Sequence, residues 1–265
     1  MKKLLSVLLC AVMVLSLAAC GKKDDNNADG KKVFTVGIDA EYPPFSYLGD
    51  DGSYTGFDIE VAQAACDLLG WEMKVFPVNW EQKLTQLDAK ECDCIWSGMT
   101  ILDSMKEAGY VISEPYYDNT QVLLVKADSG YKTSKDLAGK TVAVQLGTSG
   151  ETLLNGNLSD LKASFANVVT CNSFLSCFTE LGGGSVDAVF VDYPVAAAYV
   201  AENDGYSIID EGLGAEQYGI AFRSGDQKLC DQIQAAVDQL VENGTYQKIA
   251  DKYPDIVNNL IFLNK

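Results

Sequence analysis

Candidate ligand-binding side chains lie just past the carboxyl ends of several expected strands. Asp39 and Tyr42 follow the first of these strands, Trp80 follows the second, and Asp192 follows an apolar run much further along the chain. Ligands of open α/β sheets bind at this edge. A carboxylate can hold an ammonium group, and an aromatic ring can pack on a ligand or face a cation. Turns also collect polar residues, so the pattern favours a ligand site without proving one.

A second group of residues could bind an anion. Thr148 and Ser149 lie where an expected strand turns into a helix, and free backbone N–H groups at a helix N-terminus bind anions without a basic side chain. This matters because Arg223 is the single arginine of the chain. Three residues after another strand would complete such a site: Ser97, Gly98 and Thr100.

The composition excludes several kinds of chemistry. The 265 residues include no histidine, which removes Ser-His-Asp and Cys-His nucleophiles, histidine bases and histidine-ligated metals. The 37 acidic and 20 basic residues give a net charge of −17, the wrong sign for a general nucleic-acid binder. We therefore expect no catalytic residues, no metal, no cofactor and no nucleic-acid partner.

Short strand-like and helix-like segments alternate from residue 33 onward, which is typical of α/β architecture. The strands that we expect span 33–38, 73–78, 92–96, 119–125, 141–144, 163–169 and 187–191. The helices that we expect span 58–69, 80–89, 173–181 and 229–241, the last with the clearest amphipathic pattern.

The first twenty residues have the pattern of an export signal. Lys2 and Lys3 precede an apolar run that ends at Leu17-Ala18-Ala19-Cys20, which resembles the cleavage and acylation site of bacterial lipoproteins. We expect a signal peptide over 1–19, a lipid on Cys20 and a flexible tether over 20–32. A transmembrane anchor is the alternative interpretation of the apolar run.

Six further cysteines follow the signal segment: Cys66, Cys92, Cys94, Cys171, Cys177 and Cys230. Several fall at apolar positions, where cysteine acts as a small buried residue. An exported protein with an even count could also form disulfides, and Cys171 with Cys177 is the one pair that the spacing leaves open.

Residues 56–61 (GFDIEV) carry the sharpest resemblance to a known family. The chain resembles bacterial extracellular solute-binding proteins of family 3, the receptors of polar amino-acid ABC transporters. Further segments agree along nearly all of 33–253, including 37–45 (GIDAEYPPF), 93–100 (DCIWSGMT), 113–117 (SEPYY), 137–140 (LAGK), 186–189 (VDAV), 218–222 (YGIAF) and 243–246 (NGTY).

The resemblance implies a type II periplasmic-binding-protein-like fold, with two α/β lobes, mixed sheets flanked by helices, and a ligand cleft between the lobes. By the family's pattern, the chain visits lobe 1, crosses to lobe 2 and returns. Lobe 1 would comprise 33–117 plus 219–265 and lobe 2 would comprise 123–213. Hinge crossovers would fall at 118–122 and 214–218.

The resemblance also implies roles for individual residues. Asp192 matches the family's acid for a ligand α-ammonium, Tyr42 and Trp80 match its aromatic walls, and Asp39 matches a position that faces basic side chains. From the residues alone, Trp80 could instead belong to the core and Asp39 could cap a strand. The expected ligand-binding set is Asp39, Tyr42, Trp80, Ser97, Gly98, Thr100, Met105, Gln145, Thr148, Ser149 and Asp192.

One position departs from the family's pattern. Where the family carries an arginine that clamps the α-carboxylate, this chain has Met105, with Lys106 beside it. Three ligands remain open: an amino acid held by backbone N–H groups and Lys106, a modified amino acid or small peptide, or a cationic amine without a carboxylate.

The resulting expectation is a monomeric, lipid-anchored substrate-binding protein on the outer face of a bacterial membrane. It would capture an amino acid or related amino compound and deliver it to the permease of an ABC transporter, without enzymatic activity. The alternatives are a dehydratase of the prephenate or arogenate type on the same fold, and a solute-sensing surface protein.

Overall fold

The computed structural model describes residues 30–264. The expected signal peptide, the lipid on Cys20 and the tether up to residue 29 lie outside the described residues. Among residues 30–264, no helix has both the length and the apolar character needed to cross a bilayer.

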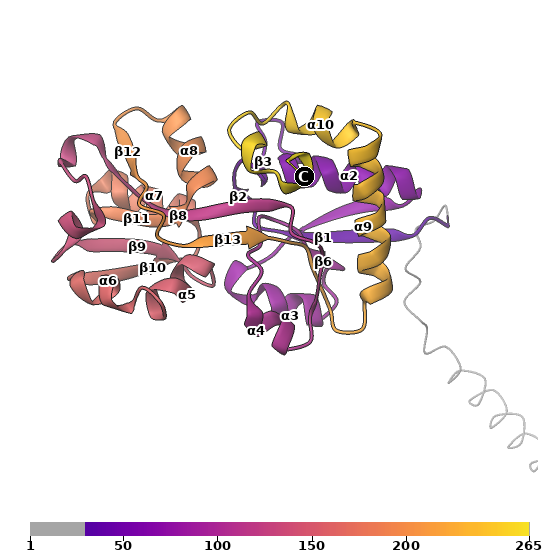
Figure 1. Cartoon of the computed structure of the whole chain (residues 1–265), viewed down its shortest axis with the longest axis horizontal. Coiled ribbons are helices and arrows are strands. Elements are labelled where there is room, and N and C mark those ends of the chain that lie inside the picture. Colours follow the sequence, from indigo (N-terminus) through magenta and orange to yellow (C-terminus); the bar gives the residue numbers. More distant parts are fainter. Residues whose placement is uncertain (1–29, 265) are drawn as a thin grey trace, which may run out of the picture.

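Two lobes lie side by side, each built around its own sheet (Figure 1). The first sheet has the order β5-β1-β6-β14-β7, in which β1 pairs in parallel with β5 and β6 while β14 pairs antiparallel with β6 and β7. Its strands are β1 (Val33–Ile38), β5 (Glu72–Pro77), β6 (Cys94–Ile95), β7 (Val111–Ile112) and β14 (Ala221–Phe222).

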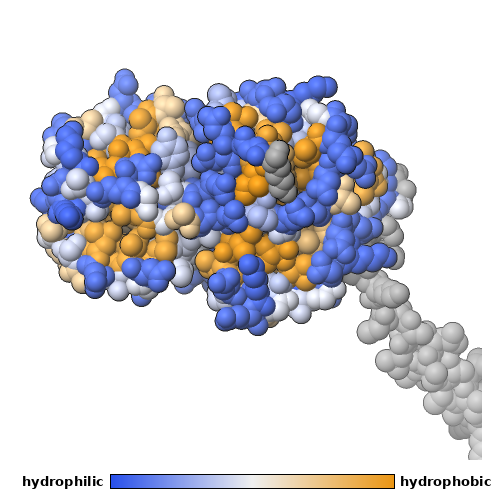
Figure 2. Space-filling view, in the orientation of Figure 1, coloured by the Kyte–Doolittle hydropathy of each residue, from blue (hydrophilic) through white to orange (hydrophobic). Residues whose placement is uncertain are grey.

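Helices cover the first sheet from both sides. In the view of Figure 1, α2 (Phe57–Leu69) and α10 (Thr245–Ala250) lie above the sheet, and α3 (Lys83–Asp88) and α4 (Asp103–Glu107) lie below it. The helix α9 (Gln227–Glu242) packs on α2 and α10 through one apolar stripe, whereas its outer face is hydrophilic (Figure 2). The short segment η1 (Trp80–Gln82) leads into α3, and a small sheet is formed by β2 (Glu41–Tyr42), β3 (Ser46–Leu48) and β4 (Tyr54–Thr55).

The second sheet has the order β10-β9-β11-β8-β12, with β13 also paired to β8. Its strands are β8 (Tyr117–Lys126), β9 (Thr141–Gln145), β10 (Asn167–Cys171), β11 (Ala188–Asp192), β12 (Tyr206–Ile209) and β13 (Ala215–Tyr218). The helices of this lobe are α5 (Ser149–Asn155), α6 (Ser159–Ser164), α7 (Phe174–Gly183) and α8 (Tyr193–Glu202). The remaining short helical segments of the chain are η2 (Ala127–Ser129), η3 (Ser134–Leu137), η4 (Val257–Asn259) and η5 (Ile261–Leu263).

Side-chain alternation along β8 explains why the second lobe has helices on both faces of its sheet. Val122 and Leu124 pack in the cluster that contains the apolar side of α7 and α8, whereas Leu123 and Val125 pack with Leu154 of α5. Successive side chains of a strand point to opposite faces, so a strand buried on both sides is apolar at every position. The α/β fold class expected from the sequence is confirmed.

Two strands join the lobes. The ten-residue strand β8 leaves the first lobe at Tyr117, and β13 returns beside it in antiparallel register, with Tyr117 opposite Tyr218 and Asn119 opposite Glu216. The strand β8 contains the segment 118–122, and β13 covers 215–218 of the segment 214–218, the two segments assigned above to the crossovers. That assignment of hinges, and the lobe boundaries that go with it, stay predictions.

The expected strand at 163–169 is wrong in its first half. The helix α6 continues through Ser164, and β10 begins only at Asn167. Leu158 and Leu161 pack with buried Phe165 in the cluster below the sheet, which favours helix there. The β-branched pair Val168 and Val169 then starts the parallel pairing with β9.

Six cysteines in the described part of the chain are free and buried. This agrees with the interpretation of these residues as small apolar side chains. The pair Cys171 and Cys177 is not joined in this structure.

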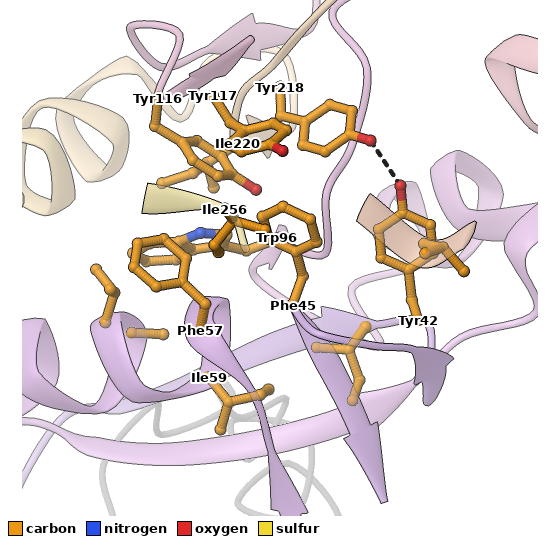
Figure 3. Close-up of a cluster of buried hydrophobic side chains, with 14 of the residues drawn as sticks. Tyr42, Phe45, Phe57, Ile59, Trp96, Tyr116, Tyr117, Tyr218, Ile220 and Ile256 are labelled. Carbon is orange, nitrogen blue, oxygen red and sulfur yellow. Dashed lines mark hydrogen bonds between the residues drawn. The ribbon is translucent and has the colours of Figure 1, made fainter. Parts of the chain in front are cut away.

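An aromatic cluster ties the first lobe to the joining strands. Phe45 packs edge-on against both Tyr117 and Tyr218, and Tyr117 stacks on Tyr218 (Figure 3). Beneath this cluster, fully buried Asp58 at the start of α2 accepts hydrogen bonds from the Gly98 N–H and the Tyr116 hydroxyl, each at 2.7 Å. Asp58 therefore holds the loop at Gly98 against Tyr42.

Asp58 should make stability depend on pH. Burial raises the pKa of Asp58 to about 7, so the folded protein keeps a proton that the unfolded chain loses near pH 4. The contribution of this group to the free energy of unfolding therefore falls as pH rises from about 4 to about 7. Asp58→Asn should remove that contribution. Between these pH values, the free energy of unfolding of the variant should therefore rise relative to that of the wild type by on the order of a few kcal/mol.

Urea unfolding at a series of pH values measures the difference. Asp67→Asn, at an exposed carboxylate of the same helix, is the matched control and should follow the wild type. If the free energies of unfolding of Asp58→Asn and the wild type change in parallel with pH, the pKa of Asp58 is not raised in the folded protein.

Candidate ligand site between the lobes

A pocket lies between the two lobes, and eight of the eleven expected ligand-binding residues line it. From the first lobe these are Tyr42, Trp80, Gly98, Thr100 and Met105, and from the second Thr148, Ser149 and Asp192. The remaining lining residues are Lys83, Met99, Leu102 and Gly147. Both lobes thus contribute to one site, as the resemblance implies.

Strand register brings an acid pair to this site. Asp192 ends β11 opposite Gln121 of β8, and Glu216 of β13 lies opposite Asn119, two positions along the same face of β8. Side chains at these paired positions share one face of the sheet. Asp118 and Gln217 alternate to the other face, where the Gln217 Nε2 donates to Asp118 at 2.9 Å in solvent.

The two carboxylates share their hydrogen-bond donors. The Asn119 Nδ2 donates to both Asp192 Oδ1 and Glu216 Oε1 at 2.7 Å, and the Gln121 Nε2 donates to the same two oxygens at 2.8 and 3.0 Å. Glu216 Oε1 also accepts from the hydroxyls of Thr100 at 3.0 Å and Ser149 at 3.1 Å. These bonds all reach Oδ1 of Asp192 and Oε1 of Glu216, so the second oxygen of each carboxylate receives none of them.

Burial and mutual repulsion raise the pKa of Asp192. Only 3% of Asp192 is exposed, and its pKa rises to about 8, first because of burial and second because of the charge of Glu216. The pair therefore favours either a shared proton or a cation placed beside it. An ammonium group is such a cation.

A hydroxyl chain connects Asp192 to the opposite lobe. The Tyr218 hydroxyl donates to Asp192 Oδ1 at 2.9 Å, and the Tyr42 hydroxyl lies 2.7 Å from that of Tyr218 (Figure 3). Because the Tyr218 proton is committed to Asp192, Tyr42 is the donor in the second bond. The Tyr42 ring also packs near Phe174 of the second lobe, at 6.0 Å between centroids.

Asp39, Ser97 and Gln145 lie beside the pocket and connect the lobes. The Gln145 Nε2 donates to Asp39 Oδ2 across the cleft at 2.8 Å, and the Ser97 hydroxyl accepts from the Asp39 N–H at 2.9 Å. Burial raises the pKa of Asp39, while the bond from Gln145 acts in the opposite direction. In this structure one carboxylate oxygen of Asp39 therefore accepts a hydrogen bond that holds the two lobes together.

The anion-binding half of the site differs from the expectation. Lys106 points away, with an exposed side chain paired to Asp103 at 3.7 Å. Arg223 is held by Asp93 and Asp226 in the first lobe and is absent from the pocket lining. Lys83, which is not among the expected ligand-binding residues, lines the pocket together with Met105.

Lys83 and Glu216 are residues of the candidate site that sequence reasoning missed. Lys83 begins a short helix, where a lysine has the pattern of a solvent-exposed residue. Glu216 falls in a segment assigned to a crossover, and the signal that could have found it is the alternation of side chains along 117–121 and 214–218. That signal becomes specific only when the register of β8 against β13 is known.

Comparisons with known proteins identify the family of this chain. The family model of bacterial extracellular solute-binding proteins, family 3, matches residues 34–255. The chain belongs to this family. It is 33% identical over 231 residues to the L-cystine-binding protein TcyJ of Escherichia coli strain K12, covering 86% of this chain and 85% of that relative.

Further relatives show the same likeness. The arginine-binding extracellular protein ArtP of Bacillus subtilis is 32% identical, covering 96% of this chain and 98% of its own. Among solved structures, an ABC uptake transporter substrate-binding protein from Streptococcus pneumoniae with bound histidine matches with a TM-score of 0.80 and 31% identity, over 83% of this chain and 91% of that chain. The expected type II binding-protein fold is confirmed.

Removing one charge of the acid pair should stabilise the protein when no ligand is bound. Because Asp192 keeps its proton up to about pH 8 beside Glu216, its contribution to the free energy of unfolding falls as pH rises from about 4 to about 8. Glu216→Gln removes the neighbouring charge, so we expect a higher free energy of unfolding at pH 7 to 8, by about 1 kcal/mol, and a shallower pH dependence.

Thermal and urea unfolding of ligand-stripped protein at pH 6 to 9 test this expectation. The control is Asp118→Asn, which removes an exposed acid from the other face of the same strand pair. A Glu216→Gln variant that is less stable than the wild type, or equally pH-dependent, would contradict the account of the pair.

Proposed function

We propose that this protein is the substrate-binding component of an ABC transporter for an amino acid or a closely related amino compound. The acid pair carries the proposal. Asp192 lines a pocket walled by Tyr42 and Trp80, and Glu216 shares its hydrogen-bond donors, so the pocket suits an ammonium group on a compact ligand.

Direct contacts between the lobes support capture by closure. Gln145 reaches Asp39, and the Lys83 Nζ donates to the Gly147 carbonyl at 2.7 Å. The Thr100 hydroxyl also reaches Glu216 on the strand that returns to the first lobe. A protein that opens by a hinge would lose these contacts and regain them around its ligand.

The remaining parts of the proposal follow from family membership and from the sequence. The protein is a monomer held at the outer face of the bacterial membrane by a lipid on Cys20, and it delivers its ligand to the permease of the transporter. It performs no catalysis. The acid pair disfavours the dehydratase alternative, because prephenate-like substrates carry carboxylates that Asp192 and Glu216 would repel.

A thermal-shift screen of ligand-stripped protein tests the proposal. The panel holds the common amino acids, L-cystine, their carboxamides, small polyamines and dipeptides. A ligand at 100 times its Kd should add about 2.7 kcal/mol of stability. Asp192→Ala should lower the affinity for the best primary amine tenfold or more, through loss of a charged hydrogen bond of about 1.5–3 kcal/mol. No thermal shift with any compound of the panel, or unchanged affinity in Asp192→Ala, would refute the assignment.

Closure itself should depend on Gly147. A Cβ at this position would lie 2.6 Å from the Glu81 Cα on the opposite lobe, so Gly147→Ala should hold the lobes apart and lower ligand affinity at least tenfold. Gly139→Ala is the matched control, because Gly139 shares the positive φ, +73° against +72°, but has nothing within 4 Å of its Cβ position.

Calorimetry with the best ligand of the screen measures both variants. Equal affinity losses in Gly147→Ala and Gly139→Ala would trace the effect to backbone strain, and no loss in either would show that ligand binds without this contact.

A further inference from the structure

Lys83 is the basic side chain of the pocket lining in the described part of the chain. It begins α3 in the first lobe and reaches across the cleft. Its Nζ donates to the Gly147 carbonyl of the second lobe at 2.7 Å and to the Trp80 carbonyl at 3.1 Å. It also lies over the Trp80 ring, 4.7 Å from the centroid.

The bonding of Lys83 leaves capacity for an anion. An ammonium group has three donors, and the two backbone carbonyls take two of them. The charges that act on Lys83 are those of Asp39 and Glu151, and burial lowers its pKa to about 8 in spite of them. Lys83 is therefore a cation without an ion-pair partner of its own, and a bound carboxylate would supply one.

The position of Lys83 complements the acid pair. Asp192 and Glu216 accept from the side-chain amides of Asn119 and Gln121, whereas the Lys83 Nζ donates to the backbone carbonyls of Trp80 and Gly147. The pocket lining thus contains one acid of the pair, Asp192, and a base, Lys83, and the two have different hydrogen-bond partners. An amino acid zwitterion carries the two matching charges.

We propose that Lys83 binds the α-carboxylate of an amino acid ligand. This inference rests on the proposed function and narrows it to ligands with a free carboxylate. Lys83 takes the place of the arginine that the family resemblance expects where this chain has Met105. Lys106, the neighbour considered from sequence, stays in solvent with Asp103.

The test compares each amino acid with its own α-carboxamide, which keeps the ammonium group and loses the negative charge. The probes are the common amino acids and L-cystine with the matching amides, and the readout is Kd from calorimetry. For the amino acid that binds wild-type protein most tightly, the Kd should be lower than that of its carboxamide by about tenfold or more. Lys83→Met removes the contact with Gly147 for both ligands, so the test is the difference between them: binding of that acid should weaken by at least about tenfold more than binding of the amide.

Two further variants keep the test decisive. Lys106→Met makes the same substitution at the exposed neighbour and should preserve the preference for the acid. Lys83→Gln supplies a polar replacement if Lys83→Met does not fold, which the unfolding midpoint without ligand reports, and it should lose the preference for the acid as well.

Each other outcome overturns the inference. If Lys83→Met weakens acid and amide equally, Lys83 acts only as a latch between the lobes through Gly147. If the wild type binds amides or amines as well as acids, the ligand carboxylate does not meet Lys83. If wild-type protein binds neither the acid nor the amide of any pair, the proposed amino-acid function is wrong, and this inference, which rests on it, is wrong as well.

Discussion

Asp192, which is buried, and Glu216, which is partly buried, share their hydrogen-bond donors, and the rest of the structure depends on this pair of carboxylates. Asp192 and Glu216 both accept from the side-chain amides of Asn119 and Gln121, and burial together with their mutual repulsion raises the pKa of Asp192 to about 8. Such a pair is costly unless a proton or a cation lies beside it. An ammonium ligand beside the two carboxylates would remove this free-energy cost, and its attraction to them would be strongest when the lobes are closed and water is excluded.

The fold creates this pair through strand register. The antiparallel ladder of β8 and β13 carries Tyr117 with Tyr218 and then Asn119 with Glu216 along one face, and β11 adds Asp192 opposite Gln121. The same two strands are the covalent connection between the lobes. The residues that would hold the ligand charge are therefore placed on the segments about which the lobes would turn, and the bonds from Thr100 and Tyr42 bring the first lobe to the same point. We expect this arrangement to couple the binding of a charged ligand to closure of the lobes.

Much of this organisation could be predicted from the sequence, and the failures have physical causes. Asp192, Tyr42 and Trp80 were found because they follow apolar strands, where α/β sheets place ligands. Glu216 was missed because its role depends on a pairing between residues 97 positions apart, which no local pattern reports. Lys83 was missed because its contact with the Gly147 carbonyl joins two lobes. The strand expected at 163–169 failed where packing of Leu161 and Phe165 favoured helix over the local β-pattern.

Proton release on ligand binding tests the central claim most directly. Calorimetric titration at pH 7 in two buffers of different ionisation enthalpy, with the ammonium-bearing ligand that binds best, counts the protons exchanged. If Asp192 and Glu216 hold a proton that the ligand displaces, the wild type should release a large fraction of one proton per ligand, and Glu216→Gln should release less, although burial still raises the pKa of Asp192 in that variant. Binding of an ammonium ligand with no proton release would contradict the account, because it would mean that the buried acid pair is fully charged before the ligand arrives.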